Sequence, residues 1–551
     1  MQLSTPVKFG NKLTLLSLAL FWLLTIQLQS AAQAPAPPSG SATAEAKTAR
    51  YFDSIKTNPL EVYAFLREMP KGGDLHLHLS GTVYAESFIE WAATQPNICV
   101  DPVTFGLVTC DGSANKPPAS RALTDGVLYR RMLYSMSMLN WDKSGLSGHD
   151  QFFDAFAKFG SASDTPRFGD MVAEVTKRAI SERVSYLEIM LTPDNGKSRE
   201  AGRKLDWPNN DLTKFPAAEL MAFLAKKREE LLAGGIVQPI SPGTTSAIQE
   251  TKKNLDELET RLRELLNCAD SSKASPACQL PIRYVYQVAR LNAPREAFAQ
   301  MVGAMEIMKA EPRVVALNLV QPEDARSAMN NFSLQMKMLD YLHSVADYKN
   351  GNVTLHAGEL APGLVPPEGL RFHIRDSVQQ GHAKRIGHGV DVMYEDKPYD
   401  LLREMAAKRV LVEVCLTSND GILGVRGKEH PLPLYLKFGV PVALATDDLG
   451  ISRTEMTREY AKAVNDHGLD YLQLKRLARN SLEHAFIGGG SLWQDANRFL
   501  PVAVCQSALQ SVTPSAACQS YLNANARAKL QLELEKSFAQ FEKDCCGGST
   551  K

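Results

Sequence analysis

Four histidines and two adjacent carboxylates lie where short apolar runs of the sequence end. They are His76, His78, His356, His388, Asp447 and Asp448. His76 and His78 are separated by one residue, and such residues on a β-strand project from the same face, so both imidazoles can reach one point. Three imidazoles and one carboxylate suit Zn²⁺ with an open position for water. Each of these residues or pairs alone has a simpler interpretation, such as a helix N-cap for the Asp pair. Together they predict a metal site.

The runs that carry these residues are short and apolar, and amphipathic stretches separate them. They cover residues 74–79, 184–191, 282–288, 314–320, 352–356, 385–389, 410–416 and 440–446. Strands that alternate with helices indicate a parallel sheet in an α/β fold. Eight of them predict a (β/α)8 TIM barrel, which carries its active site at the carboxyl ends of the strands. The histidines and carboxylates stand at those ends.

The composition of the chain is that of an ordinary globular protein. Of its 551 residues 44% are hydrophobic and 22% are charged, and the formal net charge is zero. A nucleic-acid-binding domain is usually strongly basic, so we expect no nucleic-acid partner.

The first 32 residues have the layout of a secretory signal peptide. Lys8 and Lys12 precede an apolar run over residues 13–26, and small residues follow as far as Ala32. This layout predicts cleavage after Ala32, export to the periplasm or the extracellular space, and no stable membrane anchoring afterwards. An uncleaved anchor is the alternative, although the run is short for a membrane span. We expect residues 33–50, rich in Pro and Ala, to form a disordered lead-in.

The cysteines agree with export. Three close pairs lie in polar stretches: Cys99 with Cys110, Cys268 with Cys278, and Cys505 with Cys518. After a signal peptide, such pairs predict disulfides that staple loops. Cys415 lies inside an apolar run and is predicted to be a buried free thiol. The sequence leaves the role of Cys545 and Cys546 open.

Several motifs resemble those of the adenosine deaminase family and occur in the family's order. They are Met69-Pro-Lys-Gly-Gly-Asp-Leu-His-Leu-His-Leu-Ser-Gly81, His356-Ala-Gly-Glu359, Arg385-Ile-Gly-His-Gly389, Glu413-Val-Cys-Leu-Thr-Ser-Asn419, His430-Pro-Leu432 and Thr446-Asp-Asp448. The resemblance spans roughly residues 65–490. The opening motif, together with the signal peptide, is similar to the secreted growth-factor-like branch of this family.

The resemblance implies a zinc-dependent hydrolytic deaminase that converts adenosine, and 2′-deoxyadenosine, to inosine and ammonia. The implied ligands of its single zinc ion are His76, His78, His356 and Asp447. His388 would act as base or electrostatic orienter beside the water. Asp448 would orient the nucleophile and hydrogen-bond the purine. Glu359 would be protonated and donate to purine N1, which requires a dry pocket that raises its pKa.

The implied substrate contacts include two departures from the family's pattern. The expected contact residues are His78, Ser80, Gln321, Asp448, Phe152, Phe156 and Phe159. Ser80 stands where many members have an acidic residue that contacts the ribose, and Gln321 where the family usually has Gly. An N6-modified adenosine, adenine or AMP is therefore an alternative substrate, although no basic phosphate-binding loop follows His78.

Three of these residues, Phe152, Phe156 and Phe159, recur at helical spacing. The resemblance aligns their segment with a gate helix that closes over the purine and excludes water. A stripe that faces the core is the alternative interpretation.

The resemblance also sets the expected domain limits. We expect the barrel over residues 51–490 and a C-terminal helical extension over 491–551, with a helix at 521–543. Residues 195–281 are longer than the family's usual connection, and we expect an inserted set of helices there, either packed on the barrel or forming a protein-contact arm.

Two competing functions remain: a different amidohydrolase, or a non-catalytic adenosine-binding or signalling relative. The sequence retains every implied metal ligand and the implied acid, and this disfavours the non-catalytic function. The sequence does not determine the oligomeric state.

Overall fold

Eight parallel strands form the centre of the molecule. The computed structural model describes residues 43–547, apart from 210, 510 and 512. The strands are β1 (Gly72–His78), β4 (Val184–Leu191), β5 (Ile282–Ala289), β6 (Val314–Val320), β7 (Thr354–Ala357), β8 (Arg385–His388), β9 (Leu411–Val414) and β10 (Val442–Leu444). They make two four-stranded parallel sheets, in the orders β1-β4-β5-β6 and β7-β8-β9-β10.

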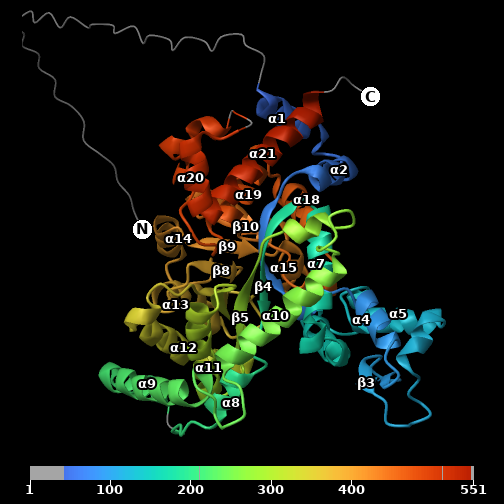
Figure 1. The fold of residues 1–551 in the computed structure, drawn as a ribbon, viewed down its shortest axis with the longest axis vertical. Coiled ribbons are helices and arrows are strands. Elements are labelled where there is room, and N and C mark those ends of the chain that lie inside the picture. Colours follow the sequence, from blue (N-terminus) through green and yellow to red (C-terminus); the bar gives the residue numbers. More distant parts are fainter. Residues whose placement is uncertain (1–42, 210, 510, 512, 548–551) are drawn as a thin grey trace, which may run out of the picture. The chain divides into compact units, whose positions relative to one another are not determined.

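Backbone contacts on both sides join the two sheets into a ring. The amide of Leu317 in β6 donates to the carbonyl of Asn352 at 3.1 Å, and Leu317 forms a parallel bridge with Val353 just before β7. On the other side, the amide of Asp447 donates to the carbonyl of His76 in β1 at 2.8 Å. The predicted (β/α)8 barrel is therefore confirmed (Figure 1). Each of its eight strands overlaps a predicted run.

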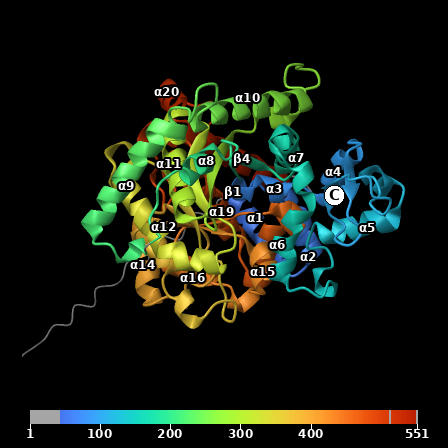
Figure 2. The same ribbon diagram turned by 90° about the horizontal axis from the view of Figure 1, so that it is seen from below.

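Helices cover the outside of the ring (Figures 1 and 2). The main ones are α7 (Phe168–Ser181), α11 (Pro294–Ala310), α12 (Arg326–Ser344), α13 (His373–Gln379), α14 (Pro398–Lys408), α16 (Leu432–Phe438), α18 (Met456–His467) and α19 (Tyr471–Glu483). Two short helices, α15 (Leu416–Leu423) and α17 (Leu449–Ser452), follow β9 and β10 at the carboxyl ends of those strands. These ends also carry the predicted site residues, as barrel enzymes place them.

A long segment between β1 and α7 forms its own group of elements. It contains α3 (Leu79–Thr82), α4 (Ala85–Ala93), the hairpin of β2 (Ile98–Val100) and β3 (Leu107–Thr109), α5 (Gly126–Ser135) and α6 (Gly148–Phe159). The predicted disulfide between Cys99 and Cys110 links the two sides of this hairpin. The group places α6 beside the carboxyl ends of the barrel strands, because α6 packs on α15.

The segment between β4 and β5 contains α8 (Lys197–Arg203), α9 (Ala217–Leu231) and α10 (Ala247–Leu265). A capping box starts α10, in which Ser246 bonds the Gln249 amide and Gln249 bonds back. Leu255, Leu258 and Leu262 on one face of α10 are buried against the barrel side. Of the two arrangements considered for this insertion, the structure has the packed one, and the predicted Cys268–Cys278 disulfide follows it.

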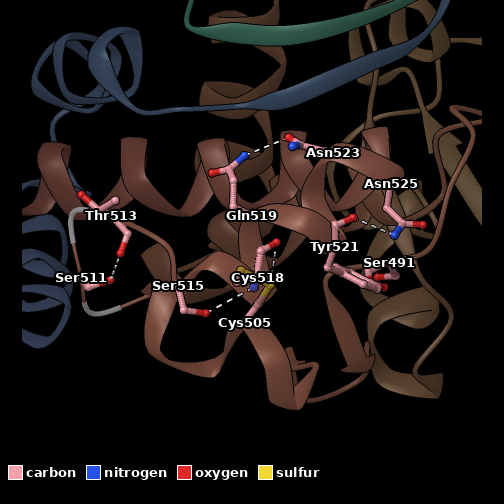
Figure 3. The surroundings of a disulfide bond; sticks show 10 residues. All are labelled: Ser491, Cys505, Ser511, Thr513, Ser515, Cys518, Gln519, Tyr521, Asn523 and Asn525. Atoms are coloured by element: carbon pink, nitrogen blue, oxygen red, sulfur yellow. Dashed lines mark hydrogen bonds between the residues drawn. A yellow bond between two sulfur atoms is a disulfide. The ribbon is translucent and has the colours of Figure 1, made fainter.

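The C-terminal extension contains β11 (Trp493–Asp495), β12 (Leu500–Pro501), α20 (Ala516–Ala524) and α21 (Ala526–Gly547). The helix expected over 521–543 is divided at Asn525, whose side chain bonds the carbonyl of Tyr521 and accepts from the amide of Gly490. The third predicted disulfide, Cys505–Cys518, ties α20 to the segment before it (Figure 3).

The expectation of a disordered lead-in over 33–50 is wrong for its last part, because α1 (Ala44–Ile55) begins there. Thr48, Phe52 and Ile55 are buried on one face of α1, which lies beside α21 (Figure 1). Glu45 pairs with Lys475 of α19 at 2.6 Å. This helix is stabilised by contacts with segments more than 400 residues away in the chain. The composition of residues 33–50 alone therefore could not predict it.

The predicted signal peptide lies outside the described residues, as does the first part of the lead-in. Within the described part of the chain, no helix is both long enough and apolar enough to cross a membrane. Cys415 is a buried free thiol, as predicted.

Candidate active site

Three imidazoles converge on one point at the carboxyl end of the barrel. The Nε2 atom of His356, at the end of β7, lies 3.1 Å from the Nε2 atoms of both His76 and His78, at the end of β1. Asp447, just after β10, places its Oδ1 atom 3.7 Å from Nε2 of His76 and 3.5 Å from Nε2 of His78. All four side chains are buried, and their donor atoms lie within 4.8 Å of one another.

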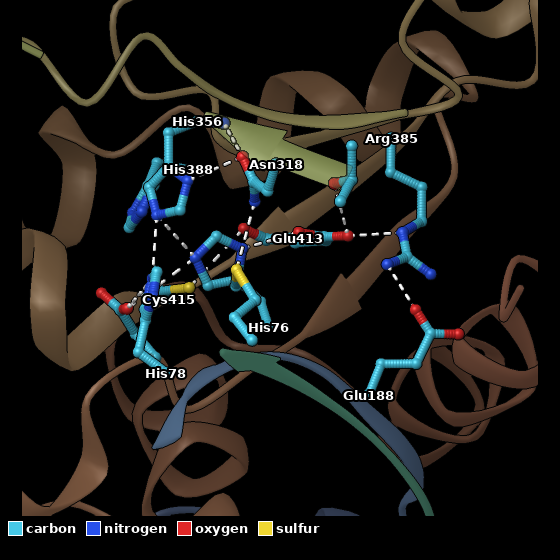
Figure 4. Close-up of polar contacts among 12 residues, drawn as sticks. His76, His78, Glu188, Asn318, His356, Arg385, His388, Glu413 and Cys415 are labelled. Carbon is cyan, nitrogen blue, oxygen red and sulfur yellow. Dashed lines mark hydrogen bonds and ion pairs between the residues drawn. The ribbon is translucent and has the colours of Figure 1, made fainter. Parts of the chain in front are cut away.

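The chemistry of these donors fits a metal cation. Each Nδ1 atom faces an oxygen acceptor: Glu413 for His76 at 2.6 Å and Asn318 for His356 at 3.0 Å (Figure 4), and Gln287 for His78 at 2.8 Å. The ring protons therefore lie on Nδ1, and three Nε2 lone pairs face one another. Zn–N bonds of about 2.05 Å in tetrahedral geometry place nitrogen atoms about 3.3 Å apart, close to the observed 3.1 Å.

A buried ionic network supports this candidate metal site from inside the ring. Glu413 of β9 also pairs with Arg385 of β8 at 2.5 Å, and Arg385 pairs with Glu188 of β4 at 2.6 Å (Figure 4). All three side chains are fully buried. Arg385 and His76 together lower the pKa of the Glu413 carboxyl against the effect of burial. Glu413 is therefore an ionised acceptor that holds the ring of His76 in place.

A second group of possible ligands overlaps the first. His76, His388, Cys415 and Asp447 also bring their donor atoms together. Burial raises the pKa of the Cys415 thiol well above its ordinary value, with the charge of Asp447 adding to this effect. The set with three imidazoles is the better candidate, because His78, His356 and Asp447 line a cavity at the strand ends, whereas Cys415 does not.

The cluster of three imidazoles and Asp447 opens into a cavity of about 470 Å³. Its lining includes most of the predicted substrate contacts: His78, Ser80, Phe152, Phe156, Gln321 and Asp448. The predicted acid Glu359 also lines it. Other lining residues come from the ends of β4, β5 and β6: Thr192, Gln287, Ala289 and Val320. Among the described residues that line this cavity, none is Lys or Arg.

Glu359 lies in an environment that favours the protonated form of its carboxyl group. Its side chain is buried, with 9% of its surface exposed, and it lines the cavity three residues after His356. Burial raises the pKa of Glu359 well above its ordinary value, and the charges of Asp447 and Glu323 add to the effect. A carboxyl group in this environment keeps its proton at neutral pH.

A chain of hydrogen bonds fixes the tautomer of His388. The amide of Leu432 donates to Nδ1 of His430, so Nε2 of His430 donates to the Asn419 oxygen at 3.1 Å. The Asn419 amide nitrogen then donates to Nδ1 of His388 at 3.0 Å. Burial lowers the pKa of His388 to about 4. The neutral ring therefore carries its proton on Nε2, which is buried and has no partner among the described residues.

Asp448 approaches the cavity across Gly81. A Cβ atom on Gly81 would lie 1.6 Å from Oδ1 of Asp448, so only glycine leaves room for this carboxyl group. Oδ1 has no hydrogen-bond partner within the described part of the chain. Burial, followed by the charge of Asp447, raises the pKa of Asp448, and a bound dication would act in the opposite direction.

The predicted gate helix is α6, but only part of the predicted aromatic stripe lines the cavity. Phe152 and Phe156 do so, together with Phe153, which the sequence interpretation omitted. Phe159 does not line it, because its ring stacks on Phe88 of α4 at 4.6 Å with 2% of its surface exposed. Phe152 and Phe156 thus line the cavity and Phe159 packs in the core, while closure of this helix over a purine stays a prediction.

The comparisons with known proteins place these residues in a family. The family model described as adenosine deaminase matches residues 142–491, well over half of the chain. The chain belongs to the adenosine deaminase family. The match begins after β1 and includes Glu359, His388 and the Asp447–Asp448 pair of the site.

Individual relatives of the adenosine deaminase family match shorter parts. The adenosine deaminase of Clostridium perfringens is 28% identical over 182 residues, covering 33% of this chain and 51% of the relative. That of Shewanella loihica is 35% identical over 136 residues, covering 24% and 38%. The chain thus spans about half the length of the first relative, and less of the second. The structure of an Arabidopsis N6-mAMP deaminase is 19% identical, with a TM-score of 0.47 over 77% of this chain and 96% of that one.

Both departures from the adenosine deaminase pattern lie at the cavity. Ser80 lines it from α3 and is partly exposed. Gln321 lines it just after β6 and has a backbone φ of 84°, in the left-handed region that favours glycine. The position thus keeps the backbone of a glycine site, while the side-chain oxygen of Gln321 accepts from the amide of Leu291 at 3.1 Å.

Sequence reasoning missed the residues that orient the site. They are Gln287, Asn318, Glu413 and Ser418, which bond the predicted ligands, and Asn419 and Glu323, which bond His388 and the Glu359 amide. Part of the signal was present, since Glu413, Ser418 and Asn419 lie within a motif that resembles the family. Gln287 and Asn318 occupy inward-facing positions of β5 and β6. The alternation of inward and outward residues along a strand could have identified them.

Proposed function

We propose that this protein is a zinc-dependent hydrolase that deaminates adenosine, and 2′-deoxyadenosine, to inosine and ammonia. One observation carries the proposal: three imidazole nitrogens and Asp447 meet at the base of a cavity that the buried side chain of Glu359, whose pKa is raised by burial, also lines. A cation site beside a proton donor is what hydrolysis of a C–N bond in a purine amidine requires.

The side chains have separate tasks in this reaction. A Zn²⁺ ion held by His76, His78, His356 and Asp447 would lower the pKa of water toward neutrality and so supply the nucleophile. Glu359 donates its proton to N1 of the purine while C6 is attacked. One proton of the attacking water passes to the amino group, which leaves as ammonia, and the other returns to Glu359 as C6 becomes a carbonyl. His388 offers its Nε2 proton as a hydrogen-bond donor and holds the attacking oxygen in line.

Asp448 and the aromatic side chains of α6 complete the site. Asp448 orients the attacking oxygen and binds the imidazole side of the purine with its unpartnered oxygen. Phe152 and Phe156 cover the cavity and exclude water, which keeps the Glu359 carboxyl protonated.

The cavity lining favours an uncharged nucleoside over a nucleotide. No Lys or Arg lies among its described lining residues, and recognition of a phosphate usually requires such a cation. Ser80 and Gln321 keep an alternative open: an N6-modified adenosine or adenine could be the preferred aminopurine. A non-catalytic adenosine-binding role is disfavoured, because ligands and acid are all in place.

We also propose that the protein is exported and belongs to the secreted growth-factor-like branch of the family. The signal-like layout of residues 1–32 and the three disulfides support this proposal, because disulfides persist in oxidising compartments.

A substrate panel tests the activity. The zinc-loaded protein without residues 1–32 is incubated with adenosine, 2′-deoxyadenosine, adenine, AMP and N6-methyladenosine, and purine absorbance and amine release are followed. We expect the two unmodified nucleosides to react fastest. Faster amine release from another compound would identify that compound as the preferred substrate. Amine release from none of them would overturn the proposal.

A further inference from the structure

A buried carboxylate clamps the backbone of the loop that carries the proposed acid. Glu323 lies three residues beyond β6, next to the end of β7. Its Oε1 atom accepts from the amide of Gly358 at 3.1 Å, and its Oε2 atom accepts from the amide of Glu359 at 2.9 Å. The two oxygens of one side chain thus hold two successive amides, one of them that of Glu359 itself.

The clamp is itself held rigidly. Nδ1 of His373 lies 2.5 Å from Oε1 of Glu323, and the His373 ring stacks on Phe332 at 4.1 Å. The Arg290 guanidinium lies 3.9 Å from the same oxygen and donates to the carbonyl of His356 at 2.7 Å. Glu323 is 2% exposed. Although burial opposes its ionisation, His373 and Arg290 lower the pKa of Glu323, so the clamp is anionic.

The loop needs such a clamp because its backbone is unusual. Gly358 has a φ of 74°, and a Cβ atom there would lie 2.4 Å from Oδ1 of Asp391. A glycine in this conformation gives the loop a sharp turn but no side-chain packing of its own. The carbonyl of Gly358 accepts from the amides of Val390 and Asp391 at 2.8 and 3.2 Å, and Glu323 holds the N–H side of the same loop.

We propose that Glu323 is a positioning residue, which holds the Gly358 and Glu359 amides so that the Glu359 carboxyl points into the cavity. This inference rests on the proposed function, in which Glu359 is the proton donor. General-acid transfer requires placement within hydrogen-bond reach of the substrate, and a misplacement of about 1 Å can lower the rate about 100-fold. Glu323 acts through Glu359 and does not line the cavity.

The first test measures the clamp without using the reaction. Amide hydrogen exchange at Gly358 and Glu359 is compared between wild type and Glu323→Gln. A glutamine has one acceptor oxygen, so it cannot accept from both amides with the carboxylate's geometry. We expect exchange there to accelerate about tenfold, corresponding to one lost buried hydrogen bond. Unchanged exchange at both amides would overturn the proposal.

Glu395→Gln is the matched control. Glu395 is also buried, and its Oε1 atom alone accepts from two successive amides, those of Ile374 and Arg375 in α13. The variant therefore removes a buried carboxylate outside the acid loop while one acceptor oxygen remains. In this variant, exchange at Gly358 and Glu359 should remain at the wild-type rate.

The second test is kinetic. In zinc-loaded Glu323→Gln, kcat on adenosine should fall about 10- to 100-fold while KM changes less than about threefold, with an unchanged zinc content. Glu395→Gln should keep kcat within about threefold of wild type. Equal losses of kcat in the two variants would show a general structural effect and would overturn the proposal.

A third variant covers failure of Glu323→Gln to fold. His373→Gln keeps the carboxylate but removes the imidazole that holds it. Faster exchange at Gly358 and Glu359 with a lower kcat would support the clamp, and unchanged exchange would overturn it. A wild-type protein without activity on any aminopurine would refute the proposed function, and the exchange comparison would still decide whether the clamp exists.

Discussion

Nδ1 of His76 lies 2.6 Å from Oε2 of Glu413, and both side chains are fully buried. This contact crosses the inside of the ring from β1 to β9. It fixes the proton of His76 on Nδ1 and aims the Nε2 lone pair at the nitrogens of the other two predicted ligands. The contact therefore links the polar interior of the barrel to the proposed metal centre.

Loss of this contact should weaken metal binding. Replacing Glu413→Gln removes the anionic acceptor, and we expect zinc affinity to fall about 10- to 100-fold, as for other residues that orient metal ligands. Competition with a chromophoric chelator measures the affinity. Glu188→Gln is the control, because it removes the other partner of Arg385 but does not contact His76. Equal affinities of Glu413→Gln and the control would contradict the prediction.

The two ends of α6 should respond differently to truncation. Phe159→Ala removes a ring stacked in the core, and we expect a loss of about 3–5 kcal/mol in the free energy of unfolding. Phe156→Ala removes a partly exposed ring of the cavity, so it should cost less stability but raise KM for the nucleoside. Urea denaturation and steady-state kinetics measure the two effects. The prediction fails if Phe159→Ala raises KM without loss of stability.

Gln321 should tolerate glycine but not a β-branched residue. A non-glycine residue at positive φ costs roughly 1–2 kcal/mol, and the cost is greater for a β-branched side chain. We expect Gln321→Gly to change stability by less than about 1 kcal/mol, because relief of strain is offset by the entropy of glycine. Turnover should persist, since the backbone N–H remains. Gln321→Val should be less stable than Gln321→Gly by about 1–2 kcal/mol, and equal stability in denaturation would refute the assigned backbone conformation.

His484 should make the fold sensitive to acid. Burial, followed by the charges of Arg409, Arg385 and Arg527, lowers the pKa of His484 to about 3. The unfolded chain, with an ordinary His pKa of about 6.5, then binds more protons than the folded protein below that pH. Stability therefore rises from pH 3 to pH 6.5 and is lost as the pH falls through this window.

A variant isolates this contribution. Between pH 6.5 and 5, the free energy of unfolding of the wild type should fall relative to that of His484→Gln by up to about 1.4 kcal/mol per pH unit. Denaturation curves at several pH values give the difference. A constant difference across this range would show that His484 is not held neutral in the folded protein.

The sequence predicted the parts of the site that follow from strand periodicity and barrel geometry. His76 and His78 share a face because they are two residues apart, and the eight strand ends meet in one ring. The sequence could not assign Phe159, because its environment is set by Phe88, which is 71 positions earlier in the chain and on a different helix.

Other features depend on contacts that no local pattern encodes. The hydrogen bonds from the amides of Gly358 and Glu359 to Glu323 depend on how the loops after β6 and β7 lie against each other. Likewise, α1 is ordered by α19 and α21 at the far end of the chain. Tertiary contacts, rather than propensity, decide such segments.

The most direct test of the account is deamination by metal-stripped and zinc-reloaded protein, with and without Glu359→Gln. Conversion of adenosine to inosine and release of ammonia are measured together, with Glu395→Gln as a control for loss of a buried carboxyl group. We predict no turnover after stripping, restoration by one zinc ion per chain, and loss of turnover in Glu359→Gln with retained zinc. Turnover that survives either the removal of metal or the loss of the Glu359 carboxyl would contradict the proposed mechanism.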